Sequence, residues 1–460
     1  MEDWVRKILE KENLRNVEVK KIGNNYYAYT VSSVYDKEKK RPRKLSGKYI
    51  GRITESGIIR KVQRNIRTVF EYGNSQTIYS ILQDIAAPLR KCFSSANEIM
   101  AMASVKAVRN TPLKYIDDAY SKLYMSRIMD ASLSHSTIAM KLREIGSDIK
   151  AQHEFFKELI DDENTYLYDL SSIFSYSENT NLAERGYNKD HVFLDQINFS
   201  LLFSEERKIP VALKIYPGSI RDVKTVKKTI EEFKLYNSII VMDRGFVSMD
   251  MINYMSDNMK YIQPLRRNSR IIDYSINMKG SFTYRERGIR YGSMEYGNYM
   301  LYVYEDARLR GEEISNSIVA RAVNPEIKVH EERLGKISLI SNIGKAPDEI
   351  YLIYKEREDI EQCFDAMKNE MENDKTYLRD NDAIRGYFFV SFIALYIHYR
   401  LLEILRINDL IGKYSVNELL FELSKVYAVE YSDNKIEFNE IPKIVESLLK
   451  KINMDILPKN

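Results

Sequence analysis

The stretch that most limits the fold is a short apolar run that ends in an aspartate, SIIVMD (Ser238–Asp243). A strand that is apolar on both faces has to be covered on both faces, which is typical of α/β folds. The neighbouring segments support this interpretation, because DVKTVKKTIEEFKL places Val226, Ile230 and Phe233 on one helical face and KYIQPL has a strand pattern. The segment Tyr166–Leu265 therefore predicts an α/β unit.

The patterns along the chain predict six regions. They are a small basic β module at 1–65, a helical DNA-binding domain at 66–160, the first part of an α/β core at 161–270, a β-rich insertion at 271–345, the last part of the core at 346–410, and a C-terminal helical region at 411–460. The last part of the core is predicted to contain two long helices, at about 347–373 and 382–406. The insertion interrupts the core before its last helices.

Positive charge is concentrated near the N-terminus. The segment Asp36–Arg67 has twelve Lys and Arg against three Asp and Glu, a local charge of +9, whereas the whole chain carries only +4. Such a segment favours a polyanion partner, most naturally nucleic acid. The basic run KEKKRPRK supplies the predicted phosphate contacts, from Lys39, Lys40, Arg41, Arg43 and Lys44. The alternative is a solvated surface loop.

One helix of the 66–160 region has two interpretations. SLSHSTIAMKLREIGSD offers Ser134 or Ser136 as an N-cap and Gly146 as the stop. This helix could be the recognition helix of a helix-turn-helix, but such a pattern is more often a packed helix in a bundle, and we favour the second interpretation.

Several protein classes are excluded. The two cysteines, Cys92 and Cys363, are too few for a disulfide scaffold or a cysteine-rich zinc module, and reduced thiols favour a cytoplasmic protein. The N-terminal segment has no apolar core of a signal peptide. The longest apolar stretch, Tyr387–Ile397, is shorter than the ~20 residues of a membrane span and predicts a core helix. We therefore expect no membrane partner.

Two aspartates follow predicted strands. Asp169 ends the strand TYLYDL, and Asp243 ends SIIVMD. Carboxylates at the carboxyl ends of strands lie at the edge where α/β folds place their sites. An aspartate at a strand end is also an ordinary turn former, so neither position identifies a site alone.

A third carboxylate belongs to a polar stripe on a predicted helix, YLIYKEREDIEQCFDAMKNEM. At about 100° per residue, Tyr354, Arg357, Glu361 and Lys368 point in directions of about 0°, 300°, 340° and 320°. One stripe thus combines a candidate metal-binding glutamate with groups that bind phosphates. The alternative is an exposed face stabilised by Arg357–Glu361 pairing.

This spacing resembles the Y-(2)-R-(3)-E-(6)-K signature of DDE transposases of the insertion-sequence-four superfamily of bacterial and archaeal mobile elements. Other segments are similar to the family in the same order, namely YDLSSIF, GYNKDH, YPGSIRD, VMDRGF, LGKISLISN and DAIRGYFFVSFIAL. The resemblance runs from about Tyr166 to Arg406 and implies an RNase H-like catalytic core interrupted by the β-rich insertion.

The resemblance also implies the chemistry. Asp169, Asp243 and Glu361 would be the catalytic and metal-binding triad, with Mg²⁺ as the cofactor and Mn²⁺ as a substitute, because hard carboxylate oxygens suit these ions. Tyr354, Arg357, Lys368 and Arg244 would contact DNA. The implied partners are double-stranded element ends and target DNA, bound by a homodimer in the prokaryotic cytoplasm at the nucleoid.

The sequence departs from the family at two places. Ser171 and Ser172 stand where a Thr is common, and the single tryptophan, Trp4, lies far from the insertion. Some relatives stack a flipped base on an insertion Trp during hairpin formation, for which this chain offers only Tyr or Phe, for instance Tyr296. Two alternatives to a transposase stay open: a two-metal nuclease without strand transfer, and a domesticated or inactive sequence-specific DNA-binding protein.

Overall fold

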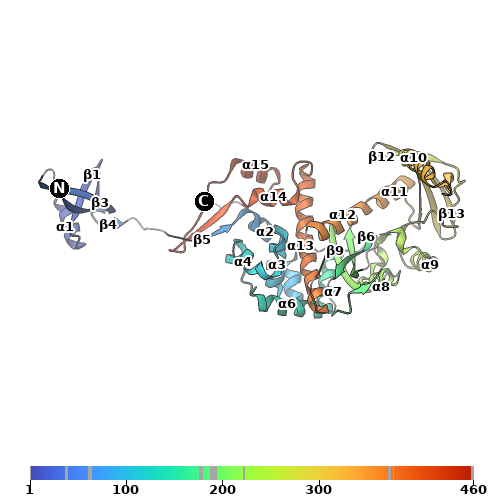
Figure 1. The fold of residues 1–460 in the computed structure, drawn as a ribbon, viewed down its shortest axis with the longest axis horizontal. Helices are drawn as coiled ribbons and strands as arrows, with labels where there is room; N and C mark the ends of the chain where they lie inside the picture. Colours follow the sequence, from blue (N-terminus) through green and yellow to red (C-terminus); the bar gives the residue numbers. More distant parts are fainter. Residues whose placement is uncertain are drawn as a thin grey trace. The chain divides into compact units, whose positions relative to one another are not determined.

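The fold is described from a computed structural model. It covers residues 2–36, 40–60, 65–175, 180–186, 194–220, 223–370, 375–376 and 378–456. The chain forms two compact units: residues 1–69 with 429–437, and residues 70–428 with 438–460 (Figure 1).

The first unit is a four-stranded antiparallel sheet with a helix on one face. Its elements are α1 (Asp3–Lys11), β1 (Val17–Ile22), β2 (Asn25–Asp36), β3 (Arg41–Thr54) and β4 (Gly57–Arg60), with the strands in the order β1-β2-β3-β4. Val5 and Ile8 of α1 pack on Tyr26, Ala28 and Ile53. The β pattern was predicted from the sequence, whereas α1 was not.

The basic run is not a loop, as the sequence suggested, but the tip and second strand of a hairpin. Lys40 occupies the turn with a φ of 45°, and Arg41, Arg43 and Lys44 belong to β3. Lys39 lies outside the described residues. The run is extended because β3 pairs with β2 as far as Asp36↔Arg41.

The second unit is built on one large mixed sheet. Its central strands are β6 (Thr165–Ser175), β8 (Asp195–Ser204), β9 (Ile209–Pro217), β10 (Ile239–Met242) and β11 (Lys260–Pro264). They lie in the order β9-β8-β6-β10-β11, where β8 runs antiparallel to both of its neighbours, β9 and β6, and β10 and β11 run parallel to β6. The predicted mixed α/β fold is confirmed, and this order agrees with an RNase H-like core. Two short strands, β7 (Glu184–Arg185) and β16 (Lys375–Thr376), pair with β8 and β6.

Residues 271–345 do not form a separate β module. The strands β12 (Gly280–Tyr284), β13 (Arg287–Tyr296), β14 (Tyr299–Asp306) and β15 (Lys336–Ser341) continue the central sheet, and β15 pairs with β11. The segment also contains a 17-residue helix, α10 (Ala307–Val323), which the sequence analysis missed. None of its residues is buried, so no apolar stripe marks it in the sequence.

Besides α10, the helices of the second unit are α2 (Gly73–Cys92), α3 (Ala96–Val108), α4 (Ile116–Tyr120), α5 (Met125–Ile128), α6 (His135–Ser147), α7 (Ile149–Leu159), α8 (Val223–Phe233), α9 (Met249–Asn258), α11 (Pro347–Lys355), α12 (Arg357–Asp365), α13 (Asn381–Ile407), α14 (Val416–Leu423) and α15 (Lys443–Lys451). Some of these helices pack on the sheet, among them α7, α9, α12 and α13, and others pack on one another. Helix α13 runs past α2, α3 and α6 (Figure 1).

Helix α6 packs on α13, which supports the bundle interpretation over a free recognition helix. Ser134 caps α6, since its hydroxyl accepts a hydrogen bond from the Thr137 amide. Gly146 is not the stop: it lies in the last turn of α6, where a Cβ would overlap the Asp382 carbonyl of α13. A Cβ at Gly386 of α13 would likewise overlap the Leu142 carbonyl of α6. The two glycines allow the helix backbones to touch.

Helix α13 is the second predicted long helix, 382–406, and it contains the apolar stretch Tyr387–Ile397. Among the described residues it is the one helix long and apolar enough to cross a membrane, and 78% of its most apolar window is buried within the protein. It forms the centre of the second unit's core.

The two regions predicted to be helical, 66–160 and 411–460, also contain strands. Residues 66–71 form a strand, β5 (Ile66–Glu71), and the predicted helical region 411–460 contains two more, β17 (Tyr427–Tyr431) and β18 (Ile436–Phe438). These three strands make one small sheet in the order β18-β17-β5. Because β5 lies hundreds of residues before β17 in the chain, no local pattern predicts the pairing of these two strands.

Candidate active site

The two predicted aspartates, Asp169 and Asp243, lie side by side on neighbouring strands. Asp243 directly follows β10, as predicted, whereas Asp169 lies inside β6 and not at its end. Strand β6 continues beyond Asp169 because it stays paired with β8 as far as Phe174. Strand β10 ends where Met242 pairs with Tyr168, so the next residues on the two parallel strands are the two aspartates. The parallel register therefore brings them together.

Asp169 points to the face of the sheet that carries the third carboxylate. It lies opposite Leu201 in the β6–β8 ladder, and directly opposed residues share a face. Phe199, two residues from Leu201, contacts Phe364 of α12 with ring centroids 5.4 Å apart. Helix α12 therefore covers the face to which Asp169 points. The neighbouring Tyr168 points to the opposite face, toward α8.

The predicted long helix 347–373 is broken into shorter pieces. Helix α11 ends at Lys355, α12 begins at Arg357, and residues Ala366–Glu370 form a π-helical turn. The stripe is thus divided: Tyr354 lies on α11, Arg357 and Glu361 lie on α12, and Lys368 lies in the π-helical turn. Only the Arg357–Glu361 spacing keeps its regular α-helical geometry.

Arg357 is the centre of the site. Its Nη2 atom is 2.7 Å from Oε1 of Glu361, and its Nη1 atom is 3.4 Å from Oδ1 of Asp243. Its side chain is only 20% exposed, and its guanidinium lies 5.9 Å from the ring centroid of Tyr354. One cation thus joins the carboxylate of α12 to the carboxylate that follows β10.

The electrostatics place Asp169 in the same group. Burial by itself lowers the pKa of Arg357, but the negative charges of Asp243, Glu361 and Asp169 outweigh it and raise the pKa. Burial raises the pKa of Tyr354, and the Asp243 charge adds to that effect. The structure therefore brings together Asp169, Asp243, Glu361, Arg357 and Tyr354.

The other predicted DNA contacts are placed differently. Arg244 is exposed beside Asp243, and its charge acts on Tyr354. Lys368 is half-buried in the π-helical turn. Lys40, Arg41, Arg43 and Lys44 belong to the first unit and are exposed there.

The carboxylates suit a hard cation by their chemistry, but they do not form a ready cage. Within the described ranges, no three His, Cys, Asp or Glu side chains are grouped as metal ligands. Arg357 forms ion pairs with two of the three carboxylates. The Oδ1 atom of Asp169 accepts a hydrogen bond from the Leu170 amide. Oxygen donors from a strand, a strand end and a facing helix are the kind of set that Mg²⁺ takes. The three carboxylates fit Mg²⁺ once the Arg357 guanidinium no longer pairs with Asp243 and Glu361.

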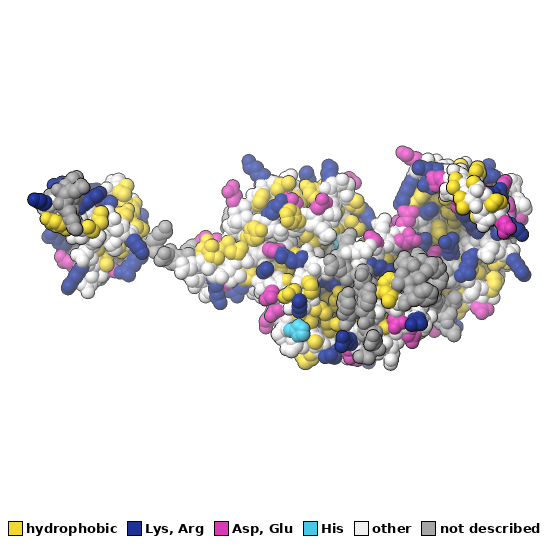
Figure 2. All heavy atoms as spheres, in the orientation of Figure 1, with side chains coloured by type: hydrophobic (Ala, Val, Ile, Leu, Met, Phe, Trp, Pro, Cys, Tyr) yellow, Lys and Arg dark blue, Asp and Glu magenta, His cyan; other side chains and the backbone are white. Residues whose placement is uncertain are grey.

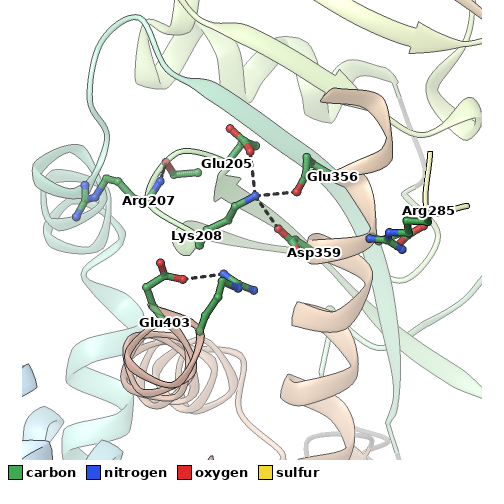
Figure 3. Close-up of polar contacts among 10 residues, drawn as sticks. Glu205, Arg207, Lys208, Arg285, Glu356, Asp359 and Glu403 are labelled. Atoms are coloured by element: carbon green, nitrogen blue, oxygen red, sulfur yellow. Dashed lines mark hydrogen bonds and ion pairs between the residues drawn. The ribbon is translucent and has the colours of Figure 1, made fainter. Parts of the chain in front are cut away.

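Sequence reasoning missed a second charged cluster, which holds the start of α12. Lys208, in the turn between β8 and β9, lies between three carboxylates (Figure 3). Its Nζ atom is 2.9 Å from Glu205, 2.8 Å from Glu356 and 3.1 Å from Asp359. Burial lowers the pKa of Lys208, but these partners raise it overall.

This cluster lies at the break before α12. Glu356 is the junction between α11 and α12, and Asp359 is in the first turn of α12, so Lys208 fixes the helix that carries Arg357 and Glu361. No sequence signal pairs Lys208 with Glu356, since 148 residues separate them.

We expect Lys208→Met to loosen this junction. The variant would leave three carboxylates close together without their cation, which costs about 1–3 kcal/mol. Amide hydrogen exchange at residues 356–361 should accelerate by about tenfold or more relative to the rest of α12 and α13. Lys208→Arg keeps the charge and should restore slow exchange. Equal exchange in the Met variant and the unmodified protein would contradict the role of Lys208.

Comparisons with known proteins bear on this site. The family profile described as "Transposase DDE domain" matches residues 160–397. Among solved structures, the piggyBac transposase synaptic complex with hairpin DNA is similar, with a TM-score of 0.43, 12% sequence identity and 76% of each chain covered. No curated protein matches the chain.

The profile spans more than half of the 460 residues and includes Asp169, Asp243 and Glu361. The match therefore covers the central sheet, the carboxylates gathered by Arg357, and most of α13. The protein belongs to the transposase DDE domain family, whose members are enzymes that cut and transfer DNA strands.

Proposed function

We propose that the protein is the transposase of an insertion sequence of the insertion-sequence-four superfamily. It binds the terminal inverted repeats of its element, nicks the DNA at the element ends and joins the released 3′ ends to target DNA. The observation that carries this proposal is that Arg357 pairs with both Asp243 and Glu361, while the strand register places Asp169 beside Asp243.

In this proposal Asp169, Asp243 and Glu361 would hold two divalent metal ions, most naturally Mg²⁺, with Mn²⁺ as a substitute. When bound, the ions supply the charge that activates an attacking water or 3′-hydroxyl and stabilises the leaving oxygen. Strand β6 and the end of β10 fix two carboxylates on a rigid sheet, and α12 brings the third.

The cations of the site hold the DNA backbone. With the carboxylate charge balanced by metal, the Arg357 guanidinium is available to bind a phosphate in a bidentate manner. Tyr354 lies under that guanidinium, and Arg244 is exposed beside Asp243, so both can contact a phosphate next to the scissile bond. Lys368 has the same role in the proposal. Attack by water and attack by a 3′-hydroxyl then use the same groups.

We further propose that the working form is a homodimer on paired element ends, in the cytoplasm of a prokaryotic cell at the nucleoid. The basic first unit supports DNA binding, because its exposed Lys and Arg provide phosphate contacts that weaken as salt rises.

The test uses duplexes that carry the repeats flanking the gene, together with a supercoiled target plasmid. The full-length protein is incubated with Mg²⁺, with Mn²⁺, or with EDTA. We expect metal-dependent 3′-end cleavage followed by joined products on the plasmid.

The products separate the alternatives. Cleavage without joined products would indicate a two-metal nuclease. Binding of the repeats without cleavage in either metal would indicate a DNA-binding protein that has lost its activity. Both results contradict the proposed transposase.

A further inference from the structure

The hairpin of the first unit extends beyond the rest of its sheet. Strand β1 pairs with β2 only along Asn25–Thr30, and β4 pairs with β3 only along Gly51–Thr54. The outer half, Val31–Asp36 paired with Arg41–Ser46, has no third strand among the described residues. We call this outer half the β2–β3 ribbon. At ~3.3 Å per residue it is roughly 20 Å long.

The ribbon has two faces of different character. Directly opposed residues of an antiparallel pair share a face, and successive residues alternate. The pairs Ser32↔Leu45 and Val34↔Arg43 therefore lie on one face together with Arg41, and we call it the arginine face. The pairs Ser33↔Lys44 and Tyr35↔Pro42 lie on the other, the lysine face.

The lysine face is used within the unit. Lys44 is 3.2 Å from Glu18 of β1, and the Ser46 hydroxyl donates to the same carboxylate at 2.7 Å. On the arginine face, the side chains of Arg41 and Arg43 make no hydrogen bond or ion pair with the described residues. Val34 and Leu45 lie beside them with 54% and 39% of their surface exposed. Two guanidiniums without a side-chain partner in the described part of the chain share one face of a thin ribbon with two exposed apolar side chains.

This combination is typical of a surface that reads DNA. A two-stranded ribbon fits the major groove of B-DNA, which is about 12 Å wide. Arginine binds guanine edges in a bidentate manner, and aliphatic side chains contact the thymine methyl group. The surroundings are basic, with +9 over Asp36–Arg67, and Figure 2 shows Lys and Arg side chains around this unit.

Other nucleic acids fit this face less well. Single strands are held by stacking on aromatic side chains, and the arginine face has none, since Tyr35 lies on the lysine face. Double-stranded RNA has a major groove too narrow for side chains to read. Duplex DNA is therefore the occupant that the arginine face matches.

We propose that the arginine face of the β2–β3 ribbon enters the major groove of duplex DNA and reads base edges. Arg41 and Arg43 contact guanines, and Val34 contacts a thymine methyl group. This inference rests on the proposed function and adds to it the element that selects the DNA sequence. From the sequence, only phosphate contacts were expected of this basic run.

The test compares two neighbouring cations that lie on opposite faces. Full-length protein, Arg43→Gln and Lys44→Gln are each incubated, without divalent metal, with a pool of random-sequence duplexes, and the bound fraction is sequenced. The enriched duplex and a scrambled duplex of equal composition are then titrated by fluorescence anisotropy at several salt concentrations. Both substituted residues are exposed, and equal melting temperatures would show that the variants are folded.

We expect the unmodified protein to enrich a motif that contains guanine. Arg43→Gln should lose the preference at one position and reduce the ratio of specific to scrambled affinity by about tenfold to a hundredfold. Lys44→Gln should keep the motif, and should weaken binding to both duplexes alike.

Two results would overturn the inference and leave the proposed function standing, provided that the unmodified protein still cleaves and joins DNA. One is an unchanged motif and affinity ratio in Arg43→Gln. The other is an equal loss of the motif in both variants. Failure of the unmodified protein to bind any duplex would overturn the inference and the proposed function together.

Discussion

Replacing Glu361 by Gln is expected to lower DNA strand cleavage by at least about 10³-fold. The change removes one negative charge from the three carboxylates and keeps the size of the side chain. Stabilisation of the reacting phosphate by bound metal amounts to several kcal/mol, and each 1.36 kcal/mol is a factor of ten in rate. The measurement is single-turnover cleavage of an element-end duplex in Mg²⁺.

Glu358→Gln is the matched control, because Glu358 lies on the same helix and pairs with Arg285 instead of Arg357. It should cleave at nearly the unmodified rate. Both variants should keep their DNA affinity and melting temperature, since both carboxylates are partly exposed. Equal rates for Glu361→Gln and Glu358→Gln would remove Glu361 from the catalytic set.

The largest effect on stability is expected from Gly386→Ala. A Cβ at this position would overlap the backbone carbonyl of Leu142, so the crossing of α6 and α13 would have to open. Because the obstacle is backbone, no side-chain rotation relieves it. We expect a loss of about 3 kcal/mol or more and a melting temperature lower by about 5 °C or more.

Gly311→Ala provides the control within a helix. Gly311 is an exposed residue of α10, and a Cβ there would meet no atom of the described structure within 4 Å. Alanine is the better helix former by about 1 kcal/mol, so this variant should be as stable as the unmodified protein or slightly more stable. If thermal unfolding shows the same stability for both variants, the helices do not touch at Gly386.

The strands of the central sheet were predictable because burial leaves a local pattern. The run SIIVMD predicted β10, and the amphipathic spacing of Val226, Ile230 and Phe233 predicted α8. Helix α10 and the sheet of β5, β17 and β18 left no such pattern. The first has no buried residues, and the second joins segments that are far apart in the chain.

The candidate site was predictable in its members but not in its geometry. The spacing of Arg357 and Glu361 placed both on one helix face, and the resemblance supplied Asp169 and Asp243. The sequence could not show that the helix breaks at Glu356, because Lys208, which holds that junction, comes from a distant turn.

The sequence by itself determined which residues are chemically suited to the site, because residue type and helical spacing are local properties. Only the tertiary structure decided that Arg357 lies between Asp243 and Glu361, and that the basic run is a ribbon with two unlike faces. Both features depend on strand register and helix packing. These are set by contacts between segments that are distant in the chain, and no local pattern encodes them.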